Sequence, residues 1–301
     1  MKALLRKLLK DTNLSYYRQL YKLKKNGKKD LETKKREIAE RYEMLMGRQL
    51  DWENPKTYTE KLNYSKLLCA NEEKTLLTDK ILVRDWVVKK IGAEYLVPLL
   101  GVYDQYKDID FSSLPDKFVL KCNHDSGSVT IVNEKAKMDH KLLKKRYNFW
   151  MKRNFADSQH EMHYSDIVPK IMVEKHMGTN INDYKFLCFD GEPMYCWVDS
   201  DRFVDHKRDI YDMEWKLQPF NQYHFDNADV PLEKPMQFEE MREIAKILSA
   251  GFDHVRVDLY VIDGKVYFGE MTFTSGSGFE KISPEEWDYK LGEMWKLEVK
   301  E

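Results

Sequence analysis

Two Asp-Gly pairs constrain the fold of this chain more than any other feature of its sequence. Asp190-Gly191 and Asp263-Gly264 each stand between two short runs rich in β-branched and aromatic residues. Asp-Gly favours the tight turns with positive φ that join antiparallel strands. Parallel neighbours would instead need long crossover connections, usually helical. The sequence therefore predicts antiparallel hairpins within an α+β fold.

The remaining elements do not alternate regularly between strand and helix. Apolar residues at helical spacing predict helices over 58–68, 78–91, 139–155 and 238–250. Short β-rich runs predict strands over 96–102, 118–121, 129–132, 171–174, 184–189, 194–198, 255–262 and 265–273. A doubly wound parallel sheet would show strict alternation, so this order favours antiparallel sheets with separate helices.

The length of 301 residues suggests about two structural units. The sequence changes from helical to β-rich near residue 96. We therefore divide the chain into a basic helical segment (1–45), a helical unit (46–110) and an α+β domain (111–301). Within that domain we expect a first lobe over about 111–172 and a second over about 173–301.

Charge and cysteine usage exclude several classes of protein. The 50 Lys and Arg balance the 51 Asp and Glu, which leaves no general excess of positive charge for nucleic-acid phosphates. No apolar run approaches the roughly 20 residues of a membrane span, and Arg6 interrupts the apolar start that a leader peptide would need. The four cysteines form neither a C-x-x-C pair nor a zinc-like group, which fits reduced thiols in a cytoplasmic protein.

Residues 1–45 are helical in pattern and strongly basic, with five lysines crowded between Lys22 and Lys29. One interpretation is a solvated helix that packs on its own domain. The other is a basic amphipathic segment that lies on an anionic membrane surface. The sequence leaves both open.

Residues 117–132 are typical of a strand, a loop of small residues and a second strand. Ser126, Gly127 and Ser128 would let backbone N–H groups approach anionic oxygens, and Lys121 would place a point charge beside them. The P-loop pattern is absent. Asp-Ser-Gly-Ser is also common turn chemistry, so a phosphate loop and a plain hairpin turn both remain open.

A second group of residues flanks the Asp263-Gly264 turn. With a two-residue loop, Asp258 pairs with Gly269 and lies on the opposite face from Glu270. With a three-residue loop, Arg256 pairs with Glu270, and both carboxylates share one face with Arg256 and Thr272. Only this second register would build a site.

Two carboxylates on one face would suit Mg²⁺, which prefers one or two carboxylates plus phosphate oxygens. Arg256 could then neutralise charge on a transferring phosphoryl group. The alternative is a cross-strand ion pair between Arg256 and Glu270. The small residues of 274–279 follow at once, and would act either as backbone donors to a substrate carboxylate or as a flexible connection.

Four motifs in this chain order resemble the ATP-grasp superfamily and, more closely, the TupA-like family of teichuronopeptide biosynthesis. The motifs are Asn54-Pro55-Lys56-Thr57, Lys121-Cys122-Asn123-His124-Asp125-Ser126-Gly127-Ser128, Asn182-Asp183-Tyr184-Lys185 and Phe268-Gly269-Glu270-Met271-Thr272-Phe273. The resemblance covers roughly residues 50–297. It implies two α+β lobes that clasp ATP between antiparallel sheets, and enzymes that join a carboxylate to an amine.

The resemblance also implies residue roles. Lys121, Lys185, Ser126, Gly127 and Ser128 would contact phosphates, Glu174, Lys175 and His176 would border adenine, and Asp183 would lie near ribose. Asp258 and Glu270 would hold Mg²⁺, and Arg256 and Lys185 would be catalytic. Thr272 stands where the superfamily usually has Asn, which puts its metal ligation in doubt. Candidates for substrate contacts are Arg202, Lys207, Arg208, Ser275, Gly276 and Ser277.

We therefore expect an ATP- and Mg²⁺-dependent carboxylate–amine ligase that forms an amide through an acyl-phosphate. The resemblance places it in bacterial cell-surface polysaccharide synthesis, with a uronic acid or amino acid as the carboxylate substrate, and in contact with membrane-bound glycan enzymes. Two alternatives remain open: a phosphotransferase that acts on a sugar or glycan hydroxyl, and a nucleotide-binding interaction module without catalysis.

Overall fold

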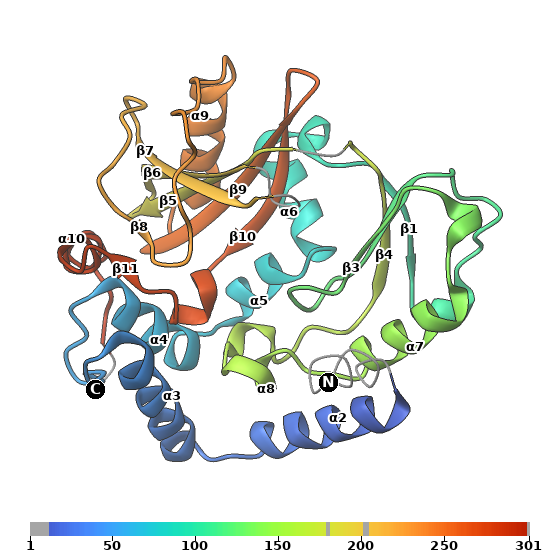
Figure 1. The fold of residues 1–301 in the computed structure, drawn as a ribbon, viewed down its shortest axis with the longest axis horizontal. Coiled ribbons are helices and arrows are strands. Elements are labelled where there is room, and N and C mark those ends of the chain that lie inside the picture. Colours follow the sequence, from blue (N-terminus) through green and yellow to red (C-terminus); the bar gives the residue numbers. More distant parts are fainter. Residues whose placement is uncertain (1–11, 179–180, 201–204, 300–301) are drawn as a thin grey trace. The chain divides into compact units, whose positions relative to one another are not determined.

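A computed structural model describes residues 12–178, 181–200 and 205–299 of the chain (Figure 1). These residues form two units that interleave along the sequence. Unit 1 holds the described residues up to Leu31, Asn71–Val83 and Val97–Met177, and unit 2 holds Glu32–Ala70, Arg84–Leu96 and the described residues from Gly178 onward. No helix in the described ranges is both long and apolar enough to cross a membrane.

Unit 1 is built on an antiparallel sheet of four strands in the order β1-β4-β2-β3. One face of this sheet carries the unit's core, in which Phe118, Leu120 and Val173 pack against Tyr147. The elements of unit 1 are α2 (Asn13–Gly27), α5 (Glu72–Thr78), β1 (Leu99–Tyr103), β2 (Phe118–Cys122), β3 (Val129–Val132), α7 (His140–Trp150), α8 (Ala156–Gln159) and β4 (Ile171–Lys175). Short 3₁₀ turns lie at Tyr106–Asp108, Lys135–Lys137 and Met162–Tyr164.

Unit 2 is built on an antiparallel sheet of five strands in the order β10-β9-β5-β6-β7. Its strands are β5 (Asp183–Phe189), β6 (Glu192–Ser200), β7 (Lys207–Asp212), β9 (His254–Ile262) and β10 (Lys265–Thr272), with the short pair β8 (Asn221–Gln222) and β11 (Ile282–Ser283). Its helices are α4 (Tyr58–Leu68), α9 (Phe238–Ser249) and α10 (Glu286–Met294). Helix α3 (Leu31–Met46) also belongs to unit 2 except for Leu31, and so does α6 (Leu82–Ile91) except for Leu82 and Val83. Turns of 3₁₀ type lie at Ala93–Tyr95 and Ser275–Gly278.

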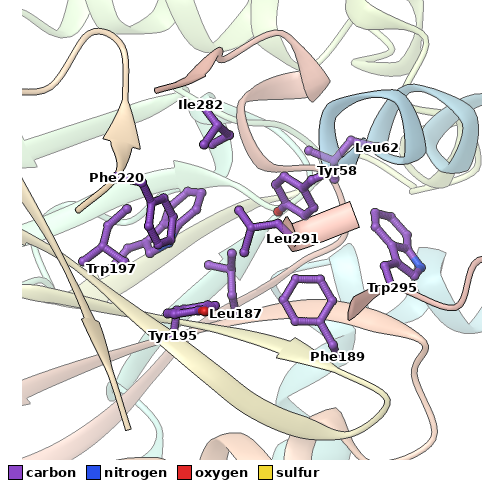
Figure 2. Packing of buried hydrophobic residues seen from close by; sticks show 11 residues of the cluster. Tyr58, Leu62, Leu187, Phe189, Tyr195, Trp197, Phe220, Ile282, Leu291 and Trp295 are labelled. Atoms are coloured by element: carbon purple, nitrogen blue, oxygen red, sulfur yellow. The ribbon is translucent and has the colours of Figure 1, made fainter. Parts of the chain in front are cut away.

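The two faces of the unit 2 sheet are covered differently. Helix α9 packs on one face, where Phe186 meets Phe238. Helices α4 and α10 cover part of the other face, where Leu187, Trp197 and their neighbours form the core cluster of Figure 2. This cluster covers only one end of that face, so the opposite end of the same strands is left for polar side chains.

Both predicted hairpins are confirmed. Asp190 and Asp263 have φ values of 52° and 51°, and the following glycines have 77° and 75°, as expected for two-residue turns whose central residues are both left-handed. All four cysteines are free, as expected for reduced thiols, and Cys122, Cys188 and Cys196 are buried.

The predicted helix over 78–91 is confirmed over 82–91 as α6, but its start was predicted four residues too early, and α5 was not predicted. Asp79 has an extended backbone conformation at the end of α5. Its side chain accepts hydrogen bonds from the N–H groups of Ile81 (2.8 Å) and Leu82 (3.2 Å). An Asp in this position satisfies the free donors of a new helix start, so it separates the two helices. Strand β7 and helix α10 were also not predicted.

The register of β9 and β10 corrects the sequence-based expectation. The loop has two residues. The strand pairs next to it run from Lys265 opposite Ile262 to Phe268 opposite Leu259. A bulge at Gly269 then shifts the register by one residue, so that Glu270 lies opposite Asp258 and Thr272 opposite Arg256. The loop length is therefore that of the first alternative, whereas the bulge brings the two carboxylates to one face, as the second alternative required.

Gly269 is the residue that makes this bulge possible. A Cβ at this position would lie 2.8 Å from the Tyr260 ring and 2.9 Å from the Asp258 carbonyl oxygen. We predict that Gly269→Ala lowers the free energy of unfolding by about 1–3 kcal/mol, since a backbone atom blocks the added methyl group. Urea denaturation measures this change.

Gly101→Ala is the matched control, because its Cβ would meet only side-chain atoms of Tyr103. A Tyr ring can rotate away, so a smaller loss is expected. Equal losses in the two variants would contradict the role assigned to the bulge.

Candidate functional site

In unit 1, the sheet face opposite the core combines an ion pair with apolar side chains. Lys121 on β2 and Glu174 on β4 lie on this face, with Nζ and Oε2 2.7 Å apart. Val129 and Ile131 on β3 share the face and are 48% and 40% exposed. A face of this kind suits a flat, partly apolar group such as adenine beside one charged pair.

The predicted phosphate loop is held by a buried network. The Asp125 carboxylate accepts hydrogen bonds from Arg153 Nε (2.9 Å) and from the Ser128 hydroxyl, while its carbonyl accepts one from Lys80 Nζ (2.8 Å). Asn123 donates to Asp79 Oδ2 (2.9 Å). These contacts fix both ends of the loop, and Asp125 is a structural anchor within it.

Only the tip of this loop faces solvent. Ser126 and Gly127 are exposed, and Ser128 is buried with its hydroxyl used by Asp125. Gly127 has a φ of 90°, and no atom would lie within 4 Å of an added Cβ. The tip can therefore approach a ligand closely, whereas Ser128 stabilises the loop through its hydrogen bond to Asp125. Lys175 is exposed and His176 is half-buried at the end of β4.

In unit 2, the polar site lies on the same sheet face as the core cluster of Figure 2. Leu187 and Lys185 are two residues apart on β5, and Trp197 and Asp199 are two apart on β6. Side chains two apart on a strand share a face. The face therefore changes from apolar to charged along its own strands.

Arg256 is the centre of this charged end. Its guanidinium binds both oxygens of Asp258, with Nε to Oδ1 2.6 Å and Nη2 to Oδ2 2.7 Å. It also donates to the hydroxyls of Thr272 (3.1 Å) and Ser275 (3.1 Å), and lies 3.4 Å from Glu270 Oε1. Burial opposes its charge, but these carboxylates outweigh that effect and raise the pKa of Arg256 above its ordinary value.

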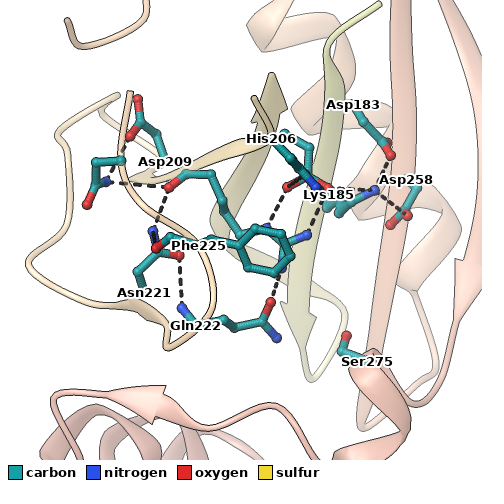
Figure 3. Close-up of polar contacts among 12 residues, drawn as sticks. Asp183, Lys185, His206, Asp209, Asn221, Gln222, Phe225, Asp258 and Ser275 are labelled. Atoms are coloured by element: carbon teal, nitrogen blue, oxygen red, sulfur yellow. Dashed lines mark hydrogen bonds and ion pairs between the residues drawn. The ribbon is translucent and has the colours of Figure 1, made fainter. Parts of the chain in front are cut away.

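Lys185 is the second buried cation. Its Nζ contacts Asp183 and lies 3.1 Å from Asp258 Oδ2 and 3.6 Å from Asp199 Oδ2 (Figure 3). Burial would lower the pKa of Lys185, but Asp183 and Asp258 raise it above its ordinary value. Lys185 therefore stays charged at neutral pH.

Arg208 is the third cation, and its guanidinium is already occupied. Nε and Nη2 bind the two Asp199 oxygens at 2.5 and 2.8 Å, and Nη1 donates to Gln222. The Phe225 ring lies 4.1 Å from its Cζ. Burial opposes ionisation of Asp199, but the Arg208 hydrogen bonds and charge hold its pKa well below the ordinary value.

The remaining candidates for substrate contacts differ in their surroundings. Lys207 pairs with the exposed Asp205 at 3.2 Å, and Arg202 lies outside the described residues. Gly276 and Ser277 are both left-handed, with φ of 55°. Helix α4 holds this loop, because Lys66 Nζ donates to the Ser277 carbonyl (2.7 Å) and Asn63 Nδ2 to the Gly278 carbonyl (2.6 Å). The loop is therefore braced by α4.

Among the described residues, the charged end of the face combines three cations with four carboxylates, and His206 Nε2 lies 3.3 Å from Asp199 Oδ1. Lys185, Arg208 and Arg256 face Asp183, Asp199, Asp258 and Glu270. The Glu270 side chain is 40% exposed, and Glu270 lies directly opposite the buried Asp258. Two carboxylates opposite each other, one of them accessible, fit Mg²⁺, which takes few protein ligands and completes its shell with phosphate and water. Within the described ranges no group of three His, Cys, Asp or Glu residues suits a metal ion.

Asp199 is the site residue that the sequence reasoning missed, since it was counted only within a charged run. It links Lys185 to Arg208. The alternation of Tyr195, Trp197 and Asp199 on β6 was the available signal, because it places all three on one face.

The fold and the site define the class of protein. Two mixed α/β units built on antiparallel sheets, with lysines on both and an Arg–Asp–Glu group on adjacent strands, are the features of an ATP-grasp protein. The profile of the TupA-like ATP-grasp family matches residues 60–296. The chain therefore belongs to the TupA-like ATP-grasp family.

Solved structures similar to this chain include three ATP-grasp enzymes. An L-amino acid ligase from Bacillus licheniformis has a TM-score of 0.43 and 15% identity, over 73% of this chain and 49% of its own. A D-alanine–D-alanine ligase from Bacillus anthracis with ATP has 0.38 and 17%, over 66% and 54%. An N5-carboxyaminoimidazole synthetase from Staphylococcus aureus with ADP has 0.38 and 15%, over 70% and 50%. The matched parts span about half of each of these chains, and no curated protein sequence matches.

The Arg208–Asp199 pair yields a prediction on stability and pH. Arg208→Met leaves Asp199 buried without its bidentate partner, so we expect a loss of about 3 kcal/mol or more at pH 7. The native pKa of Asp199 is depressed, so its contribution is present above its unfolded pKa and disappears as pH falls through the native value. The loss should therefore be smaller at pH 3, below the unfolded pKa of Asp, than at pH 7, as measured by urea denaturation.

Lys207→Met is the neighbouring control, because Lys207 pairs only with a carboxylate that is 74% exposed. Its cost should stay below about 1 kcal/mol at both pH values. An Arg208→Met loss that is the same at both pH values would contradict the depressed pKa of Asp199.

Proposed function

We propose that this protein is an ATP- and Mg²⁺-dependent ligase that joins a carboxylate to an amine. The observation that carries the proposal is the bulged register of β9 and β10, which places Asp258 opposite Glu270 with Arg256 between the carboxylates and the Ser275 loop. Membership of the ATP-grasp family supports ATP as the nucleotide.

In the proposed reaction, a substrate carboxylate oxygen attacks the γ-phosphorus of ATP, and the bond to the β,γ-bridging oxygen breaks. The products of this step are an acyl-phosphate and ADP. The amine then attacks the acyl carbon, phosphate leaves, and the amine gives up a proton. The amide carries no phosphate, so the overall products are an amide, ADP and phosphate.

The residues of unit 2 would act on the phosphates and the acyl group. Asp258 and Glu270 would hold Mg²⁺, with the Thr272 hydroxyl beside them, and the ion would supply charge neutralisation for the phosphates. Arg256 would stabilise charge on the transferring phosphoryl group. Lys185, which stays charged because three carboxylates surround it, would contact a phosphate once the nucleotide competes for it, and Asp183 would lie near the ribose.

The loop Ser275–Gly278 is proposed to bind the substrate carboxylate. Ser275 shares its hydroxyl with Arg256, so a group bound at Ser275 would lie near the cation that stabilises the transfer. Bracing of the loop by Asn63 and Lys66 would keep its position fixed during the reaction. Gly276 and Ser277 contribute backbone rather than bulky side chains. Arg202, which lies outside the described residues, and the paired Lys207 and Arg208 are further candidates for substrate contacts, and Arg208 serves first as the partner of Asp199.

The residues of unit 1 would contact the base and the phosphates. The apolar side chains beside Lys121 and Glu174 would take the adenine, with Lys175 and His176 at its border. Lys121 would exchange Glu174 for a phosphate. Backbone N–H groups of Ser126 and Gly127 at the exposed loop tip would donate hydrogen bonds to the phosphates. Ser128 would stabilise the loop conformation through its hydrogen bond to Asp125.

The substrate class follows from the family name and remains a proposal. We propose a uronic acid or an amino acid as the carboxylate, and assembly of a bacterial cell-surface polysaccharide in the cytoplasm as the setting. A phosphotransferase would use the same nucleotide contacts, and a binding module would use them without turnover. The experiment below separates these three.

The test is to incubate the full chain with Mg·ATP and a panel of uronic acids and amino acids, in the presence and absence of amines. A ligase releases ADP and phosphate only when both substrates are present, and mass spectrometry detects the amide. Transfer of the γ-phosphate to one stable acceptor would replace the ligase by a phosphotransferase. ATP binding without turnover on any pair would favour the binding module.

Glu270→Ala removes the exposed carboxylate of the proposed metal site. We expect turnover to fall at least about 100-fold, since charge neutralisation at the phosphates is lost. Glu243→Ala, an exposed Glu on α9, has the same change in charge and should retain full activity. Full ATP-dependent activity of the Glu270→Ala protein would exclude this metal site.

A further inference from the structure

Helix α2 has two apolar stripes, and only one of them packs on unit 1. Tyr16, Leu20 and Leu23 are half-buried, and Tyr16 stacks on Phe149 of α7 with ring centroids 4.6 Å apart. This inward stripe accounts for the packing of the helix on α7 and α8. The outward stripe is therefore not needed to attach α2 to its unit.

The outward stripe consists of Leu14, Tyr17 and Tyr21. Spacings of three and four residues place them on consecutive turns of one helix face. They are 58%, 70% and 67% exposed. Single exposed apolar residues are common, but two tyrosines and a leucine on one exposed face form an apolar surface that water solvates poorly.

Positive charge surrounds this stripe. Arg18 and Lys25 lie three or four residues from members of the stripe, Lys22 directly follows Tyr21, and all three are exposed. Neither α2 nor α7, which pack together within unit 1 (Figure 1), contains an Asp or Glu. The basic side chains of the two helices are Arg18, Lys22, Lys24 and Lys25 on α2 and Lys141, Lys144, Lys145 and Arg146 on α7.

Two acidic residues among those described lie at the ends of these helices. Asp139 caps the N-terminus of α7, and Asp157 lies beside Gly27 at the end of α2. The chain as a whole has as many acidic as basic residues, so the basic surface reflects an uneven distribution rather than the overall composition. Such a surface attracts an anionic partner.

We propose that the exposed face of α2, defined by Leu14, Tyr17 and Tyr21 with their flanking cations, binds an anionic lipid membrane. A purely electrostatic partner would not require the apolar stripe. A membrane surface accommodates both parts, because tyrosine rings and leucine enter the interface while Lys and Arg heads reach the lipid phosphates. This inference is independent of the proposed ligase activity.

The test is sedimentation of the full chain, including residues 1–11, with vesicles of phosphatidylcholine and phosphatidylglycerol (70:30) and with vesicles of phosphatidylcholine alone. We expect binding to the anionic vesicles and little to the neutral ones. Arg18→Gln/Lys22→Gln/Lys25→Gln should weaken binding about 100-fold, because each of the three basic residues near the surface contributes about fivefold. Equal binding to the two vesicle types would overturn the proposal.

Two further variants separate this helix face from general charge. Lys89→Gln/Lys216→Gln/Lys265→Gln has the same change in net charge at exposed positions of unit 2 and should bind vesicles like the parent protein. Tyr17→Gln/Tyr21→Gln keeps every charge and should still lose binding several-fold. Parent-like binding by the tyrosine variant, or an equal loss in the lysine control, would overturn the proposal.

Binding to a labelled RNA duplex tests whether the basic face of α2 binds nucleic acid instead of anionic lipid. Circular dichroism and thermal melting confirm that each variant is folded. Weak duplex binding that the tyrosine variant leaves unchanged agrees with a membrane-binding face. Duplex binding without vesicle binding would assign the surface to nucleic acid and overturn the proposal.

Discussion

The bidentate pair between Arg256 and Asp258 is the interaction on which the polar end of the unit 2 sheet depends. Both side chains are buried, so either one alone would carry a large desolvation cost. Their neighbours extend the compensation: Lys185 contacts Asp258, and Thr272 and Ser275 take the remaining guanidinium donors. These buried side chains therefore remain charged because each one pairs with a group of opposite charge.

The core of unit 2 makes this arrangement possible. Leu187 and Trp197 fix β5 and β6 against α4 and α10, and the next residues on the same face, Lys185 and Asp199, are then fixed in position as well. Side chains two apart on a strand share a face, so packing that fixes the apolar end of β5 and β6 also fixes the side chains at the charged end. Packing at the apolar end of the face therefore positions the strands that carry the charged side chains.

Much of the fold was accessible from the sequence, because its signals are local. Asp-Gly turns and β-rich runs predicted both hairpins and most strands, and Tyr58–Leu68 was predicted to the residue. The break at Asp79 was missed because apolar spacing continues through it, and only the side-chain caps show the interruption. The charged composition of β7 hid a buried strand, whose Arg208 is buried only because Asp199 on β6 pairs with it.

The site was predicted as a group of residues but with the wrong register. Sequence reasoning considered loop length alone, whereas the shift arises five residues after the turn, where Gly269 allows two backbones to approach closely. Nothing in loop length can encode such a bulge. A glycine inside an otherwise β-rich run was the available signal, because glycine in a strand interior often marks a bulge or a close backbone approach.

The two units offer different chemistry on their sheets. In unit 1 the face beside Lys121 is mainly apolar with one ion pair, which suits a base whose ring gains from leaving water. In unit 2 the described face carries lysine, arginine and paired carboxylates, which suits a cation and the phosphates that it accompanies. Binding would exchange internal pairs such as Lys121–Glu174 for contacts with phosphate. Because each internal pair already satisfies its charges, the free protein avoids uncompensated burial before the nucleotide arrives.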